Sequence, residues 1–242
     1  LREDTALVTL MMVNNETGAV TDIAGVARAL RAAKSKALLH TDAVQGFMKE
    51  PFSAKTLGAD MISVSGHKVH APKGIGALYI RQGLKLPAHI LGGGQEDGLR
   101  SGTEPMPQIA AFGEAVRIAK AEMPEANKRM EALRAQCVQT LTDTVPDIVF
   151  LGGGSAHILS LSLPGYRSEV LMNYLEAKGI YVSKSSACKR GKRSHVLEAI
   201  GAPDKVIDGA LRVSFSRYTT AEECAYFCEA LAAARKELYP SL

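Results

Sequence analysis

Residues 61–68 read Met-Ile-Ser-Val-Ser-Gly-His-Lys, an apolar run that ends in a lysine beside a glycine and a histidine. An earlier apolar run, residues 37–40, is followed directly by Thr41 and Asp42. Short apolar runs closed by small or polar residues are typical of strands that are buried on both faces. Both runs therefore predict strands of a parallel sheet, with polar side chains gathered where the strands end.

The sequence around these runs alternates strand and helix signals. Residues 6–13 and 75–80 are two further apolar runs rich in β-branched residues. Between 23 and 30 the apolar residues recur at the spacing i, i+3, i+4, i+7 that forms one helix stripe, and Thr21 or Asp22 is a suitable N-cap. This part of the chain predicts parallel α/β layering.

The pattern changes beyond Pro107, where a long amphipathic helix is expected to connect two domains. Thr220 and Glu223 form a capping box that opens a final helix, whose Cys224 and Cys228 are expected in the core. The remaining elements are short, and a smaller α+β domain is the natural interpretation. The expected strands are 148–151, 157–163, 180–183 and 211–216, and the expected helices lie near 169–178 and 194–200.

Composition excludes several classes of protein. With 46% hydrophobic and 22% charged residues in 242, the chain is neither disordered nor fibrous. The net charge of +4 is too small to indicate nucleic acid or an anionic membrane as the main partner. No apolar run spans a bilayer, and the four cysteines include no C-x-x-C pair suited to a metal. A cytoplasmic protein without a metal site is expected.

A lysine that follows a buried strand is a candidate for covalent chemistry. Burial disfavours the ammonium form, and a neutral amine can condense with a carbonyl as a Schiff base. Lys68 occupies such a position, and Asp42 ends the preceding strand, where open α/β sheets bind ligands. Pyridoxal phosphate (PLP) chemistry uses this pair, a lysine for the carbonyl and a carboxylate for the ring nitrogen. Taken singly, Lys68 could be an exposed turn lysine and Asp42 a helix cap.

Six ordered motifs carry a family resemblance. They are residues 13–18 (VNNETG), 40–45 (HTDAVQ), 63–68 (SVSGHK), 92–103 (GGGQEDGLRSGT), 185–197 with SSAC and SHVL, and 211–218 (LRVSFSRY). In the residues of these motifs and in their order along the chain, the sequence resembles the cysteine desulfurase family of the class V aminotransferase group, over essentially all 242 residues. The resemblance implies the aspartate aminotransferase-like fold of PLP-dependent transferases. Residues 1–122 would be an incomplete, mostly parallel large-domain sheet, and residues 123–242 the small α+β domain.

The resemblance also implies a role for each matching residue around the cofactor. Lys68 would carry PLP covalently as a catalytic residue. Asp42 would pair with the pyridine nitrogen, and Gln45 would hydrogen-bond the ring hydroxyl. Ser65 and His67 would contact the phosphate, and His67 would also belong to the catalytic group.

Three further residues are assigned by the same likeness. Asn15 would lie near the ring and the substrate. Thr103 would reach the phosphate of a neighbouring subunit, which implies a homodimer with shared sites. Arg212 would bind the substrate carboxylate, for which its planar fork of donors is suited, although a surface salt bridge is the alternative.

The implied function depends on Cys188. Removal of sulfur from L-cysteine needs a thiolate that attacks the substrate sulfur and leaves alanine and an enzyme persulfide, and a reactive thiolate is favoured by positive neighbours. Five cations surround Cys188, namely Lys184, Lys189, Arg190, Lys192 and Arg193. They indicate an exposed loop, which is either merely solvated or a docking patch for an acidic scaffold protein or for tRNA. A buried structural cysteine is the alternative for Cys188.

Two departures from the family pattern shape the expectations. The family usually has S-S-G-S-A-C where residues 183–188 read SKSSAC, so a glycine is replaced by Ser185. The family's upstream helix N-terminus and Gly/Ala-Thr loop, which cradle the phosphate, and its ring-stacking histidine have no counterpart. The chain thus resembles the later part of a longer member, and we expect it to bind PLP weakly on its own.

The leading hypothesis is a PLP-dependent cysteine desulfurase that supplies sulfur for iron–sulfur clusters or tRNA thiolation. A selenocysteine lyase or another PLP β-eliminase would depend less strictly on Cys188. A non-catalytic fragment that lacks the phosphate-binding loop is a third possibility. A dinucleotide-binding protein is disfavoured, because residues 92–94 lack the G-x-G-x-x-G spacing.

Overall fold

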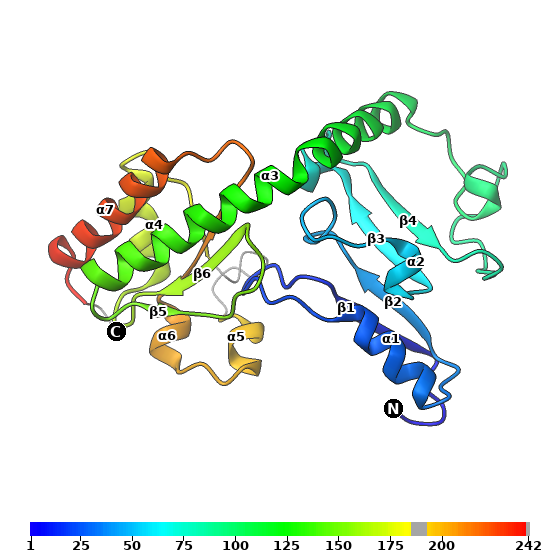
Figure 1. The fold of residues 1–242 in the computed structure, drawn as a ribbon, viewed down its shortest axis with the longest axis horizontal. Coiled ribbons are helices and arrows are strands. Elements are labelled where there is room, and N and C mark those ends of the chain that lie inside the picture. The colour runs from blue at the N-terminus through cyan, green and yellow to red at the C-terminus, as the bar shows by residue number, and fades with distance from the viewer. Residues whose placement is uncertain (185–192, 241–242) are drawn as a thin grey trace. The chain divides into compact units, whose positions relative to one another are not determined.

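The computed structural model describes residues 1–184 and 193–240 (Figure 1). The chain forms two compact units, the first made of residues 1–13 and 21–123 and the second of residues 14–20 and 124–242. In the described ranges, no helix combines the length and the hydropathy needed to cross a bilayer.

The first unit is built on a four-stranded sheet in the order β1-β2-β3-β4. Strands β1 (Leu7–Met11), β2 (Leu38–Asp42) and β3 (Met61–Ser65) are parallel, as the sequence predicts. Strand β4 (Gly76–Ile80) is antiparallel to β3, so the sheet is mixed and mostly parallel. The two edge strands carry exposed apolar side chains, for example Leu7 at 48% and Leu78 at 50% exposure.

Two helices pack in the first unit with their apolar stripes turned inward. Helix α1 (Ile23–Ala32) is capped by Asp22, whose side chain accepts a hydrogen bond from the Gly25 amide. The helix buries Ile23, Ala27 and Leu30. Helix α2 (Ala54–Leu57), a single turn that the sequence analysis missed, contacts α1. Helix α3 (Met106–Thr144) contributes residues up to Met123 to the first unit and residues from Pro124 onward to the second.

The second unit contains an antiparallel sheet in the order β5-β6-β8-β7. Its strands are β5 (Val149–Phe150), β6 (Ile158–Ser162), β7 (Ser183–Lys184) and β8 (Ala210–Ser214). The prediction of a strand over 180–183 is wrong for residues 180–182, where Tyr181 is 80% exposed and no ladder forms. A strand begins only at Ser183, which pairs with Arg212.

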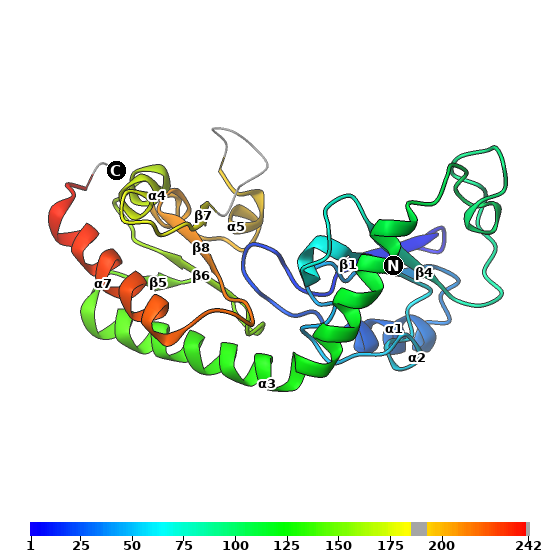
Figure 2. The same ribbon diagram turned by 90° about the horizontal axis from the view of Figure 1, so that it is seen from above.

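Four helices complete the second unit, in which α7 lies beside the C-terminal part of α3 (Figures 1 and 2). Helix α7 (Ala221–Glu237) opens with the predicted capping box of Thr220 and Glu223, and its Cys224 and Cys228 are buried as expected. The core also takes in Leu211 of β8 and the buried Cys137 of α3. The other helices are α4 (Ser168–Glu176), α5 (His195–Ala199) and α6 (Asp204–Asp208).

Candidate active site

The first group of candidate residues lies where β2 ends. Asp42 is the last residue of β2, and its Oδ1 accepts a hydrogen bond of 2.9 Å from the Val44 amide. The Ala43 amide donates to the Ser63 carbonyl of β3 at 2.9 Å, which holds the turn against the neighbouring strand. Gln45 follows in this turn and is 93% buried, since its exposed fraction is 7%. The turn therefore fixes a carboxylate and an amide beside the end of β3.

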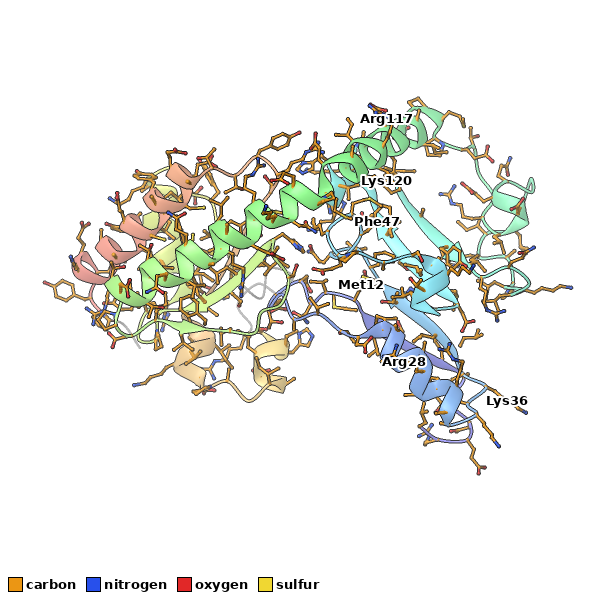
Figure 3. The ribbon with its side chains drawn as sticks, in the orientation of Figure 1. Met12, Arg28, Lys36, Phe47, Arg117 and Lys120 are labelled. Atoms are coloured by element: carbon orange, nitrogen blue, oxygen red, sulfur yellow. The ribbon has the colours of Figure 1, made fainter. Side chains whose placement is uncertain are left out.

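Two close contacts fix the rest of this turn. A Cβ on Gly46 would lie 2.5 Å from the Met12 sulfur, so a larger residue here would require the Met12 side chain to move. Phe47, which is labelled in Figure 3, packs edge-on against Phe112 of α3, and the two ring centroids lie 6.3 Å apart. The backbone that carries Gln45 is thus held by packing of the next two residues, Gly46 against Met12 and Phe47 against Phe112.

Lys68 stands in the 3₁₀ turn η1 (Gly66–Val69) that directly follows β3. A Cβ on Gly66 would lie 2.8 Å from Ile75 Cγ2, and Val69 is buried at 3% exposure. The closely packed Gly66, two residues before the lysine, and the buried Val69, directly after it, hold Lys68 at the end of the strand. Ser65 Oγ and His67 Nδ1 are hydrogen-bonded to each other at 2.7 Å.

The turn after β2 carries a second lysine that the sequence analysis missed. Burial, followed by the positive charge of Lys68, lowers the pKa of Lys49 to about 8. Lys49 lies seven residues after Asp42 in the same turn, which is the signal that could have indicated it. The strand ends of the first unit therefore hold two amines within electrostatic range of each other.

Thr103 lies in the segment between η2 (Glu96–Gly98) and α3, and it is exposed. The preceding residue, Gly102, donates its amide to Gln95 Oε1 at 3.2 Å. The structure holds one chain, so the contact of Thr103 with a neighbouring subunit stays a prediction.

Asn15 and Arg212 belong to the second unit and meet there. Arg212 Nη1 donates to the Asn15 carbonyl at 2.9 Å, and Arg212 Nη2 donates to Ser183 Oγ at 3.2 Å. Arg212 lies on β8 between Ser160 of β6 and Ser183 of β7. The Arg212 guanidinium therefore bonds a backbone carbonyl and a serine hydroxyl of the second unit.

Cys188 and Ser185 lie within 185–192, outside the described residues, as do three of the five cations predicted around Cys188. The remaining two are engaged. Lys184 forms an ion pair with Glu169 of α4, and its hydrogen bond lowers the pKa of that carboxyl. Arg193 bonds Asp204 at 2.6 Å and Asp208 at 2.7 Å, and the pKa of Asp208 is lowered by this contact. Two of the five cations are therefore paired with carboxylates of α4 and α6.

The donor set of the first unit fits PLP. Its polar groups comprise a carboxylate (Asp42), a buried amide (Gln45), an amine (Lys68) and the hydroxyl–imidazole pair of Ser65 and His67. A carboxylate suits a pyridinium nitrogen, and an amine suits the aldehyde carbon. In the part of the chain that the structure describes, no group of three or more His, Cys, Asp or Glu side chains is arranged to hold a metal ion.

Comparison with known proteins identifies the family. The model of the class-V aminotransferases matches residues 1–227. Cysteine desulfurase 2 of Trichormus variabilis is 42% identical over 228 residues, which are 92% of this chain and 56% of the relative. Cysteine desulfurase IscS of Tolumonas auensis is 43% identical over 234 residues, 93% of this chain and 56% of the relative.

A solved structure titled as a NifS-like protein superposes on this chain with a TM-score of 0.90 at 38% identity. The superposition covers 98% of this chain and 63% of the NifS-like chain. The chain therefore spans a little over half the length of the curated relatives that it matches. Class-V aminotransferases and cysteine desulfurases depend on PLP, in agreement with the donor set described above. The chain belongs to the class-V aminotransferase family.

Proposed function

We propose that this chain acts in a PLP-dependent cysteine desulfurase, which converts L-cysteine to L-alanine and transfers the sulfur to Cys188. The observation that carries the proposal is the group at the strand ends of the first unit, where Asp42, Gln45 and Lys68 are fixed by backbone contacts. The names of the relatives, cysteine desulfurases at 42–43% identity, support the same activity.

Each residue has a defined task in this proposal. The Lys68 amine holds PLP covalently, and the Asp42 carboxylate keeps a proton on the ring nitrogen. Bound PLP supplies an electron sink that weakens bonds at the substrate carbons. Gln45 orients the ring through its hydroxyl group, and Ser65 with His67 binds the phosphate. His67 adds a group that can hold or release a proton close to Lys68.

The second unit supplies the substrate and sulfur contacts. Arg212 binds the substrate carboxylate through its two terminal nitrogens, and Asn15 lies at the same place because its carbonyl accepts from Arg212. The Cys188 thiolate attacks the substrate sulfur, the carbon–sulfur bond breaks, and the sulfur remains on Cys188 as a persulfide. The carbon takes a proton and leaves as alanine, so cysteine and one thiol give alanine and one persulfide.

The partners follow from the same chemistry. A persulfide must pass its sulfur to an acceptor, and we propose an iron–sulfur scaffold or a tRNA-thiolation protein. A homodimer with shared sites is supported by the exposure of Thr103 before α3. A cytoplasmic location is supported by Cys137, Cys224 and Cys228, which are free thiols.

A non-catalytic role is the second candidate, favoured by one observation. The edge strands β1 and β4 expose Leu7 and Leu78, where a mostly parallel sheet is normally covered. This candidate keeps the fold and the lysine but forms no persulfide.

The test is alanine release from L-cysteine at saturating PLP, with Cys188→Ala as the variant and Cys224→Ala as the control. Cys224 is buried in the core and lies more than 30 residues after residues 185–192 in the sequence, so its replacement removes a different thiol. The proposal expects alanine from the unmodified chain and from the control and none from Cys188→Ala. Selenide release from selenocysteine that persists in Cys188→Ala indicates the lyase instead. Absence of alanine in the unmodified chain favours the non-catalytic candidate.

A further inference from the structure

We infer that the second unit carries a binding site for a methylated ammonium group, in a cavity walled by aromatic rings and one carboxylate. The site goes beyond the proposed desulfurase chemistry and does not depend on it. The cavity measures about 280 Å³ and lies among α3, α7, the end of β8 and residues 179–182. Small-molecule sites measure about 300–1,000 Å³, so this cavity suits a ligand of few heavy atoms.

The first support is the concentration of aromatic rings in the cavity wall. Aromatic residues are 5% of the chain, seven tyrosines and six phenylalanines, yet two of each line this one cavity. They are Tyr181, Phe215, Tyr226 and Phe227. The face of an aromatic ring carries partial negative charge, and rings grouped around a cavity recognise quaternary ammonium groups in other proteins. The composition of the wall therefore favours a cation with apolar methyl groups over an anion.

The second support is the charge of the wall. Among the described residues that line the cavity, Glu223 is the one charged side chain, and no lysine or arginine is present. Its Oε2 accepts the Thr220 amide at 2.9 Å, which fixes the carboxylate at the start of α7. The two cysteines of the wall stay protonated at neutral pH. Burial raises the pKa of Cys224 to about 12, and a hydrogen bond with Cys228 together with burial raises the pKa of Cys137. A bound cation is thus attracted by one negative charge and repelled by none.

The third support is that hydrogen bonds fix the elements that carry the rings. Tyr226 Oη donates to the Lys178 carbonyl at 3.3 Å and so ties α7 to the turn after α4, its neighbouring helix (Figure 1). The Phe215 amide donates to the His157 carbonyl at 2.9 Å, which fixes the end of β8. Tyr181 stands outside any strand and is 80% exposed, so the cavity opens to solvent on this side. The wall is therefore formed before a ligand arrives.

Isothermal titration calorimetry of the 242-residue chain tests the inference without PLP or L-cysteine. Two probes carry the ammonium group: choline, and a short peptide that contains one trimethylated lysine. The third probe is the neutral carbon analogue of choline, in which a tert-butyl group replaces the trimethylammonium group. The difference between choline and this analogue measures the effect of the charge at constant shape. Sodium chloride at equal ionic strength accounts for the general effect of salt.

Each variant changes one property of the wall. Tyr181→Leu removes a ring and Tyr181→Phe keeps it, and neither change disturbs the core because Tyr181 is exposed. Glu223→Gln removes the charge, while the new amide oxygen can still accept the Thr220 amide and keep the capping box. Tyr239→Leu is the matched control, since Tyr239 is 92% exposed and is not among the residues of the cavity wall. Far-UV circular dichroism checks that every variant is folded.

We expect saturable binding of choline or of the peptide at one site per chain, with the neutral analogue at least about tenfold weaker. Tyr181→Leu and Glu223→Gln should each weaken the binding of the ammonium probe by about threefold to tenfold. Tyr181→Phe and Tyr239→Leu should leave the Kd within about twofold of the unmodified chain. Tighter binding of choline assigns the site to a free ammonium compound, and tighter binding of the peptide assigns it to a methylated side chain of a protein.

Equal affinity for choline and for its neutral analogue would overturn the inference, because the cavity would then select shape without charge. Absence of saturable binding for both ammonium probes would overturn it as well, and so would an equal loss in Tyr181→Phe and Tyr181→Leu. A loss in Tyr239→Leu as large as that in Tyr181→Leu would place the binding outside the cavity and contradict the assignment.

Discussion

Replacement of Lys49 by methionine should stabilise the protein at neutral pH. Lys49 is half-buried in the turn after β2, and its partial burial together with the charge of Lys68 lowers its pKa from 10.5 to about 8. Because the folded state holds the proton less tightly, the unfolded chain binds more protons between pH 8 and 10.5. Stability therefore rises with pH across this interval, and the full penalty is present below pH 8.

The magnitude follows from the same values. The interval between 10.5 and about 8 corresponds to about 3 kcal/mol, at about 1.4 kcal/mol for each pH unit. Methionine fills a similar volume without a charge. The Lys49→Met variant should gain about 2 kcal/mol or more at pH 7, and its advantage should disappear as the pH approaches 10.5.

Urea unfolding followed by far-UV circular dichroism at pH 7, 8, 9 and 10 measures this difference. Lys55→Met is the control, since Lys55 is an exposed lysine of α2 and its loss should change the free energy of unfolding by about 0.5 kcal/mol or less. A Lys49→Met variant that is less stable than the unmodified protein at pH 7, or a difference independent of pH, would refute the reasoning.

Three further predictions concern the two units. Thr220→Ala removes the hydroxyl that caps α7 and should cost about 1 kcal/mol in urea unfolding, with no change in PLP binding. Leu211→Ala leaves a cavity in the core of the second unit, where Leu211 is fully buried, and should cost about 2–5 kcal/mol by the same measurement. Gly66→Ala drives a methyl group to 2.8 Å from Ile75 Cγ2. It should cost about 1–3 kcal/mol and lower the capture of PLP at Lys68, read from absorbance after borohydride reduction.

Local patterns predict most of the fold because each element carries its own signal. The parallel strands end at polar residues, and the Asp22 cap and the Thr220–Glu223 capping box appear where the sequence places them. The strand expected at 180–182 fails because an apolar, β-branched run forms a strand only where a partner ladder exists, and Tyr181 faces solvent instead.

The candidate site is predictable in part. Strand ends locate Asp42 and Lys68, since polar residues after apolar runs are visible in the sequence. The sequence does not reveal that residues 14–20 join the second unit, because that assignment depends on distant partners such as Ser194 and Arg212. The aromatic cavity of the second unit was overlooked because its rings come from separate segments, and only the fold brings them together.

The most direct measurement of the central claim is covalent capture of PLP. The chain is incubated with saturating PLP, reduced with borohydride and mapped by peptide mass spectrometry, with Lys68→Ala and the exposed-lysine variant Lys55→Ala alongside. The account predicts that Lys68 is the principal labelled lysine and that the label is lost in Lys68→Ala and kept in Lys55→Ala. Label spread evenly over surface lysines and unaffected by Lys68→Ala would contradict the account.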